Sequence, residues 1–160
     1  MEKEHTDQAL KLRWKDSDFA SLSTGELYAI LAARVDVFVV EQDCPYPELD
    51  GLDQTALHLW AANEEEQVAA YARITAPGTR FEEPSIGRVI TTSDFRGQGL
   101  GRALMNRALE LARKHYPGAS LRISAQQHLQ PFYETLGFAF VCGPYDEDGI
   151  PHVEMLRSEQ

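Results

Sequence analysis

The chain has 160 residues, of which 43% are hydrophobic and 25% charged, a composition typical of one globular domain. Acidic residues number 25 against 15 Lys and Arg, and the resulting formal charge of −10 argues against a general nucleic-acid or anionic-membrane binder. The longest apolar run covers residues 28–33, far short of the ~20 residues that span a bilayer, and no apolar segment follows the polar first residues, so we expect neither a membrane helix nor a secretory signal.

The cysteines and the absence of repeats narrow the class of protein further. Cys44 and Cys142 are far outside the paired spacing of zinc sites and redox dithiols. Without a secretory signal the default compartment is the cytoplasm, where disulfides are disfavoured, so we expect two ordinary thiols and no metal. No internal repeat, low-complexity tract or long linker divides the chain, which predicts a single domain over residues 1–160.

The first predicted elements are a strand and a helix. Residues 10–15 alternate apolar and basic side chains, the period of a strand with one wet face. Ser23 and Glu26 have the spacing of a capping box, ahead of apolar residues that recur at helical spacing as far as Phe38. We therefore expect one helix to follow the first strand and to extend to Phe38.

The rest of the chain mixes strands and helices. Hairpins are predicted where two strands flank the polar segment 63–67 and where Asp148 and Gly149 precede the last strand. In chain order, the expected elements are strands at 57–62, 68–75 and 86–92, a helix at 100–115, a strand at 121–125, a short helix at 129–136, and strands at 138–141 and 152–156. This order predicts an α/β or α+β fold in which helices flank a central, largely antiparallel sheet.

The strongest chemical motif is the glycine-rich segment 96–102, RGQGLGR, between a predicted strand and a predicted helix. The first N–H groups of a helix lack intrahelical partners, and the helix dipole makes this end partly positive. Glycines let successive N–H groups curl towards one anion and remove the Cβ atoms that would keep a phosphate away. The motif predicts a phosphate-binding turn, and the flanking Arg96 and Arg102 favour this over a tight turn without a ligand.

Two common phosphate-binding motifs are absent from the sequence. No Gly-Lys-Ser/Thr is present, so the lysine and hydroxyl of a P-loop are missing. The glycines run G-x-G-x-G instead of G-x-G-x-x-G, and residues 119–121 offer no acid for a ribose. A kinase, an NTPase and a dinucleotide-binding enzyme are therefore disfavoured.

Two motifs together resemble the acetyl-CoA signature of the GNAT superfamily of N-acetyltransferases. They are R-G-x-G-x-G at 96–101, directly after a predicted strand, and FYETLGF at 132–138. Further segments resemble the ElaA-like branch of that superfamily, namely RVDVFVVEQ at 34–42, CPY at 44–46, DGxD at 50–53 and DGIPH at 148–152. The resemblance spans nearly the whole chain. It implies a sheet that splays apart between its fourth and fifth strands, with the pantetheine arm of acetyl-CoA in the gap.

The same resemblance implies which residues hold acetyl-CoA. The backbone of Val89 and Thr91, on the fourth strand, would pair with the pantetheine amides, and an N–H near Ile90 or Thr91 would donate to the oxyanion. Gln126 stands where many members have Asn, and it keeps the amide groups on a longer arm. The residues implied at the pyrophosphate and beside it are Arg96, Gly97, Gln98, Gly99, Leu100, Gly101, Arg102 and Phe132.

The implied reaction is attack of a neutral amine on the acetyl thioester, through a tetrahedral oxyanion, with expulsion of a thiolate. Tyr133 lies at the tyrosine position of the family and would donate a hydrogen bond to the leaving sulfur; the alternative is a core tyrosine bonded to the backbone. Complete proton transfer from a phenol of pKa ~10 to a thiolate whose thiol has a pKa of ~8.5 would be uphill by ~2 kcal/mol. Hydrogen-bond donation is therefore the expected role.

The attacking amine needs a group that accepts its proton. A lysine-like amine of pKa ~10.4 is only ~0.1% neutral near pH 7.5. Imidazole is well matched to this task, and a carboxylate works better through water because it also stabilises the ammonium. Segment 36–66 holds nine carboxylates and no Lys or Arg, an acidic entrance for a cation. The candidates for the base and for contacts to the acceptor are His58, His152, Glu41, Asp50 and Asp53.

The remaining expectations concern charge and partners. Arg34 pairs either with a carboxylate of the acceptor or, in the preferred interpretation, with an acid of the chain such as Glu41. Segment 87–122 holds seven of the 15 Lys and Arg and only two of the acids, which suits an anionic cosubstrate there and a cationic amine elsewhere. We expect a small-molecule or peptidyl amine as acceptor, no nucleic acid and no membrane, and a homodimer is left open. The alternatives are a CoA-binding regulatory module without turnover and a plain interaction domain.

Overall fold

The computed structural model describes residues 11–158 and contains the predicted order of strands and helices. The strands are β1 (Arg13–Asp18), β2 (Leu57–Ala62), β3 (Val68–Thr75), β4 (Ser85–Thr91), β5 (Leu121–Gln126), β6 (Ala139–Glu147) and β7 (Ile150–Arg157). The helical elements are α2 (Thr24–Val35), the π-helical η1 (Asp36–Glu41), α3 (Leu100–His115) and α4 (Gln130–Glu134), with short 3-10 turns between them. The first strand begins at Arg13, later than predicted, and Leu10 lies outside the described residues.

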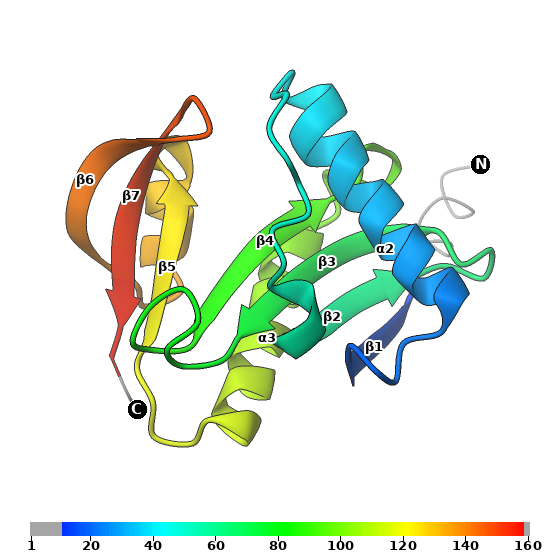
Figure 1. Cartoon of the computed structure of the whole chain (residues 1–160), viewed down its shortest axis with the longest axis horizontal. Coiled ribbons are helices and arrows are strands. Elements are labelled where there is room, and N and C mark those ends of the chain that lie inside the picture. Colours follow the sequence, from blue (N-terminus) through cyan, green and yellow to red (C-terminus); the bar gives the residue numbers. More distant parts are fainter. Residues whose placement is uncertain (1–10, 159–160) are drawn as a thin grey trace.

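The strands form two antiparallel sheets, in the orders β1-β2-β3-β4 and β5-β7-β6. The mixed fold and the splay between the fourth and fifth strands are both confirmed. The Arg122 N–H donates to the Pro84 carbonyl at 3.2 Å, where β4 and β5 both begin. From that point the two strands diverge towards their C-terminal ends (Figure 1). The divergence opens a gap between the sheets.

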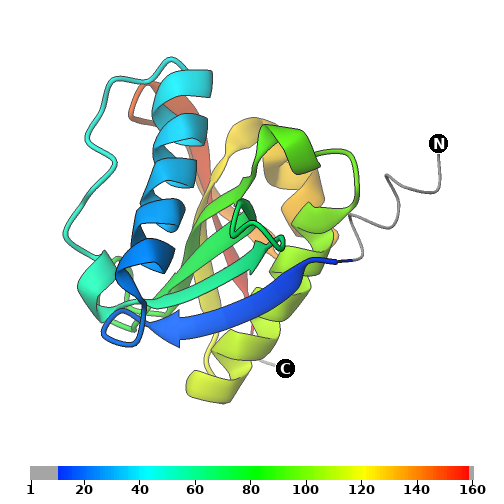
Figure 2. The ribbon, with the colours of Figure 1, turned by 90° about the vertical axis from the view of Figure 1, so that its right-hand side faces the viewer.

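Helices α2 and α3 cover opposite faces of the first sheet (Figure 2). Alternate residues of β2 point to opposite faces of the sheet, because side chains alternate in direction along a strand. Leu59 and Ala61 belong to the core cluster under α3, whereas Trp60 and Ala62 belong to the cluster under α2. The middle of this sheet is therefore buried on both sides and forms a rigid support for the gap. Among residues 11–158, none of the helices has the length and apolar character needed to cross a bilayer.

The first helix begins as predicted and ends differently. The Glu26 N–H donates to Ser23 Oγ at 3.0 Å and the Ser23 N–H donates to Glu26 Oε1 at 2.9 Å, so the capping box is confirmed. Regular α-helix ends at Val35, and the wider π-helical turns of η1 follow. Such a segment changes the direction of the side chains relative to a continued α-helix. Phe38, predicted as part of the apolar helix face, packs against the core cluster under α2 and also lines a pocket beside the gap.

Candidate active site

The glycine-rich turn has the geometry of an anion cradle. Gly97 and Gly99 have φ values of 80° and 74°, a conformation that favours glycine, and Gly99 is the N-cap of α3. A Cβ built on either glycine would meet no atom within 4 Å and would project into open space. The first N–H groups of this 16-residue helix are the unpaired donors that a phosphate accepts. The turn therefore fits the pyrophosphate of acetyl-CoA.

Both arginines of the turn are held by neighbours. Arg96 donates from Nε to the Thr91 carbonyl at 3.0 Å and from Nη2 to Glu41 Oε2 at 2.6 Å. Arg102 donates to Thr135 Oγ1 at 3.0 Å and lies over the ring of Phe132. Glu41, a predicted candidate for the base, thus lies beside the glycine-rich turn and does not line the pockets at the gap. We do not assign it the proton-accepting role, because its carboxylate is engaged with Arg96.

The edge of β4 that faces the gap can be deduced from its pairing with β3. The Thr92 N–H donates to the Ala69 carbonyl at 3.0 Å, and Ile90 is the register partner of Tyr71. Because alternate residues point their backbone groups to opposite edges, Ile90 faces β3 while Val89 and Thr91 face the gap. Of the two positions predicted for the oxyanion donor, Thr91 has the suitable direction and the Ile90 N–H is occupied by the sheet.

A pocket occupies the gap, and Tyr133 lies in its wall. Val89, Ala125 and Leu129 line it together with Tyr133. Tyr133 is 6% exposed, and its ring packs edge-on against Phe132 and Phe138. Burial raises the pKa of Tyr133 to about 12, so the phenol keeps its proton at neutral pH. In the part of the chain that the structure describes, no hydrogen bond holds the hydroxyl, unlike the core tyrosine of the alternative interpretation.

Gln126 and Phe132, the two remaining predicted contacts to acetyl-CoA, lie in different parts of the site. The amide of Gln126 lies at the mouth of the gap and donates to Gln42 Oε1 at 3.4 Å, so its amide points towards η1 in this structure. Phe132 packs at the start of α3, where a Cβ on Gly101 would lie 3.9 Å from its ring. Phe132 is therefore placed to support the glycine-rich turn.

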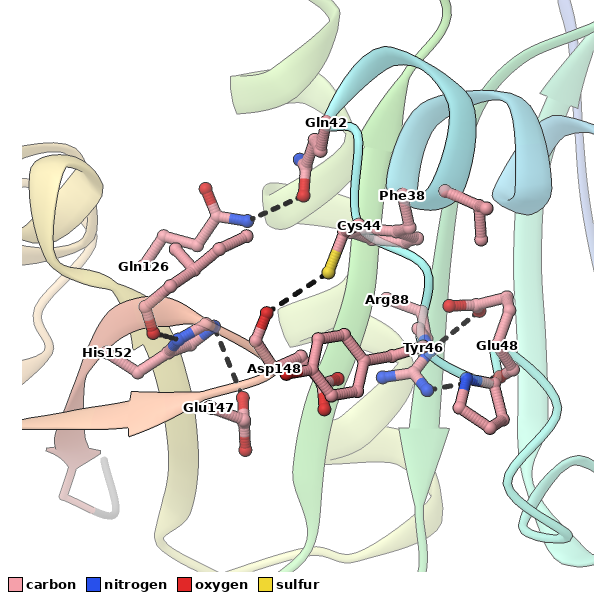
Figure 3. A pocket seen from close by; sticks show the side chains of 13 residues that line it. Phe38, Gln42, Cys44, Tyr46, Glu48, Arg88, Gln126, Glu147, Asp148 and His152 are labelled. Carbon is pink, nitrogen blue, oxygen red and sulfur yellow. Dashed lines mark hydrogen bonds and ion pairs between the residues drawn. The ribbon is translucent and has the colours of Figure 1, made fainter.

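A second pocket continues from the gap on the side of α2 (Figure 3), and we call it the acceptor pocket. One wall is the loop 43–56, which follows η1, and the opposite wall is the turn between β6 and β7. The two walls touch where Cys44 Sγ donates to the Asp148 carbonyl at 3.1 Å. The two pockets share Phe38, Arg88, Gln126, Glu147 and His152, so a ligand in one can reach the other.

His152 lies where the two pockets meet. Its Nδ1 is 2.8 Å from the Ile150 carbonyl, which can only accept, so Nδ1 carries a proton. In the neutral ring the lone pair is then on Nε2, which is 3.2 Å from Glu147 Oε2 (Figure 3). Of the five residues predicted for the base or the acceptor, only His152 lines both pockets.

The other polar candidates are brought together in a buried ionic network away from the pocket surface. Arg34 donates to Asp53 at 2.7 Å and to Glu48 at 2.8 Å, and not to Glu41, so the predicted ion pair within the chain has other partners. Arg73 donates to both oxygens of Asp50 at 2.8 and 2.7 Å and to Asp53 at 3.1 Å. Burial opposes the charge of the two aspartates, but the arginines prevail and hold their pKa values below the usual range.

His58 is also part of this network. It is fully buried, its Nε2–H donates to the Asp53 carbonyl at 2.9 Å, and its Nδ1 accepts from the Tyr71 hydroxyl at 2.7 Å. Burial lowers the pKa of His58. Arg34, Asp50, Asp53 and His58 therefore all have partners within the chain, as the preferred interpretation expected for Arg34, and their contact with the acceptor stays a prediction. The network also neutralises the middle of the acid-rich segment 36–66, so the acidic entrance is smaller than the sequence suggested.

The sequence analysis did not identify three residues of the site: Glu48, Arg88 and Glu147. Glu48 and Arg88 are 40 positions apart, yet Arg88 Nε donates to Glu48 Oε2 at 2.7 Å. Glu147 precedes the predicted Asp148-Gly149 turn, and the predicted strand ended at residue 141, whereas β6 extends to Glu147. Because β6 ends six residues later than predicted, this carboxylate lies 3.2 Å from Nε2 of His152 on β7. The only available signal was the Asp-Glu-Asp run at 146–148, whose last residue begins the DGIPH segment.

Comparison with known proteins is consistent with this geometry. A family model described as an acetyltransferase (GNAT) domain matches residues 28–158. Protein ElaA of Escherichia coli K12 is 43% identical over 148 residues, which cover 91% of this chain and 96% of that protein. An acyl-CoA N-acyltransferase structure from Pseudomonas aeruginosa matches with a TM-score of 0.88 and 45% identity over 92% of this chain and 99% of that one. The crystal structure of E. coli ElaA matches with a TM-score of 0.86 and 41% identity, with the same coverage.

Proposed function

Because this chain belongs to the GNAT family of acetyltransferases, and is therefore an acyl-CoA-dependent N-acetyltransferase, we propose that it transfers acetyl directly to a primary amine in a ternary complex. The acetyl group would come from acetyl-CoA, the cosubstrate of the family, held along the gap between β4 and β5. The observation that carries the proposal is the position of Tyr133, whose buried ring lines this gap while its hydroxyl has no protein partner among residues 11–158.

The residues would divide the work by position. The glycine-rich turn binds the pyrophosphate, and the backbone of Val89 and Thr91 binds the pantetheine arm and polarises the acetyl carbonyl. Tyr133 donates a hydrogen bond to the leaving sulfur. His152 accepts the proton of the amine at Nε2, with Glu147 beside it. The amine enters through the acceptor pocket, which joins the gap at His152.

The experiment that tests the proposal compares wild type with Tyr133→Phe. Thiol release is measured with acetyl-CoA and a panel of primary amines, and acetyl-CoA affinity by calorimetry. We expect kcat to fall at least about tenfold, because general-acid and hydrogen-bond assistance is worth ~10²-fold or more, and the dissociation constant of acetyl-CoA to change less than about twofold. Tyr116→Phe, a partly buried tyrosine at the end of α3, is the matched control and should retain wild-type kcat.

Two outcomes would contradict the proposal. An unchanged kcat in Tyr133→Phe would remove the assigned role of the hydroxyl. Wild-type protein that is stabilised by acetyl-CoA but releases thiol with none of the amines would indicate a CoA-binding module without turnover.

A further inference from the structure

Strand β4 contains a strained bulge at the point where it begins to face the gap. Between the register pairs Arg73–Gly87 and Tyr71–Ile90, β3 has one residue and β4 has two, Arg88 and Val89. Arg88 has a φ of 51°, in the left-handed region that non-glycine residues avoid. The bulge sets the direction of the next residue, Val89, whose backbone faces the gap. Its shape therefore has to be maintained by contacts elsewhere.

The side chain of Arg88 supplies these contacts, and two of its three hydrogen bonds are to Glu48. Arg88 donates from Nε to Glu48 Oε2 at 2.7 Å and from Nη2 to the Glu48 carbonyl at 3.2 Å. Its guanidinium also lies 5.8 Å from the centre of the Phe38 ring and 3.4 Å from Asp50 Oδ2. A residue that is strained in its backbone is thus fixed through its side chain.

Glu48 is fixed in turn from the other side. The same Oε2 atom accepts from Arg34 Nε at 2.8 Å, and the Glu48 side chain is only 7% exposed. Arg34 has no exposed surface and belongs to α2, which is packed on the sheet core. Glu48 itself lies in the loop 43–56, the wall of the acceptor pocket. One carboxylate therefore joins the helix, the pocket wall and the bulge, and Figure 3 shows its contact with Arg88.

From this arrangement we infer that Glu48 is a positioning residue that acts through Arg88. It holds the β4 bulge in the shape that aims the Val89–Thr91 backbone at the acetyl carbonyl, and it keeps the wall of the acceptor pocket in register with that backbone. The catalytic part of this inference rests on the proposed function. Glu48 does not touch the reacting atoms in this scheme, because its Oε2 atom is shared by two arginines.

The test is a double-mutant cycle with Glu48→Gln, Arg88→Gln and the double variant. Each single variant should lower kcat about tenfold, since small misplacements of a catalytic group cost one to two orders of magnitude. Acetyl-CoA affinity should fall less than kcat, because the glycine-rich turn that binds the pyrophosphate is untouched and only the backbone contacts to the pantetheine arm are disturbed. The double variant should lose no more activity than the worse single variant, because both changes break the same connection. Glu66→Gln, which breaks the exposed pair with Arg13, is the matched control and should retain wild-type kcat.

Amide hydrogen exchange tests the inference without requiring catalytic turnover. In Glu48→Gln, exchange should increase in segments 85–92 and 43–56 and stay unchanged in α3. A lower melting temperature with unchanged kcat in the folded variant would overturn the inference, since Glu48 would then be only structural. Additive losses in the double variant would also overturn it. If the wild type acetylates no amine, the proposed function fails, but the inferred coupling between Glu48 and β4 can still be tested. Unchanged exchange in β4 of Glu48→Gln would contradict that coupling.

Discussion

At the scale of single residues, the role proposed for His152 depends on its Nε2 atom. The Ile150 carbonyl fixes the Nδ1 proton, so Nε2 is left as the acceptor beside Glu147. Without this group, the enzyme would depend on amine that is already neutral in solution. That fraction rises tenfold with each pH unit up to the amine pKa of ~10.4.

We therefore predict that His152→Gln lowers kcat/KM for the amine about 100-fold at pH 7.5 and much less at pH 9.5. The measurement is the pH–rate profile of thiol release for the wild type and the variant. His128→Gln, at an exposed histidine near β5, is the control and should follow the wild-type profile. A loss that is equally large at both pH values would indicate that His152 only supports the pocket.

The residue types alone did not show which of the two candidate histidines is better placed to act as the proposed base. His58 and His152 both lie on strands, and both have the same reference pKa. Both are buried, and they differ in their surroundings, because both ring nitrogens of His58 are bonded to Asp53 and Tyr71 whereas His152 lines two pockets. Likewise, the acids of segment 36–66 stand out in the sequence, but the structure separates Glu41 and Glu66 from Glu48, Asp50 and Asp53, and each group has its own arginine partners. Such pairings depend on tertiary packing, which a local pattern does not contain.

At the scale of elements, the glycine-rich turn combines a backbone requirement with a ligand requirement. In Gly99→Ala, the left-handed φ of 74° should cost ~1–2 kcal/mol of stability, and the new Cβ would occupy the cradle. We predict that acetyl-CoA affinity falls at least tenfold, about 1.4 kcal/mol, with a correspondingly smaller thermal shift on adding acetyl-CoA.

The matched control for this prediction is Gly118→Ala. Gly118 has a φ of 80° and follows α3 at its other end, so the substitution carries a similar backbone cost without reaching the cradle. It should lower the melting temperature and leave the acetyl-CoA shift intact. Equal acetyl-CoA shifts in the two variants would mean that the turn does not bind the pyrophosphate.

Elements with strong local signals were predicted well. The capping box fixed the start of α2, and the regular apolar spacing predicted α3 at its observed bounds, Leu100–His115. Elements that depend on long-range pairing were predicted less well. The segment η1 was expected to continue α2, and β6 was expected to be shorter. Most of β6 is exposed, so its length is determined by pairing with β7 and leaves no alternating apolar pattern to detect. The splay of the sheet came from the family resemblance alone.

At the scale of the whole molecule, the charge of −10 is not spread as an open acidic surface. Three arginines and three acids neutralise one another in the network of Arg34, Arg73, Arg88, Glu48, Asp50 and Asp53. Within residues 11–158, the Nε atom of Arg73 is the only buried side-chain nitrogen or oxygen without a hydrogen-bond partner. A buried network that is this nearly complete strongly resists loss of any member, because the remaining charge would be left unpaired.

This network should make stability sensitive to acid in two separate ranges. The pKa of His58 is lowered by burial, so its contribution to stability is complete above its unfolded pKa of ~6.5 and is lost as pH falls through that value. The pKa values of Asp50 and Asp53 are also lowered, and their contributions are lost only below the unfolded pKa of ~3.9. The range from pH 7.5 to 5.5 therefore isolates the histidine.

We predict that the free energy of unfolding of the wild type falls by up to about 1.4 kcal/mol between pH 7.5 and 5.5, measured by urea denaturation. In His58→Gln the protein should be less stable at pH 7.5, because the packing at Asp53 and Tyr71 is altered, but the decrease between the two pH values should largely disappear. His115→Gln, at an exposed histidine, should keep the wild-type decrease. If His58→Gln keeps it as well, the acid sensitivity arises elsewhere and His58 is not held neutral by the fold.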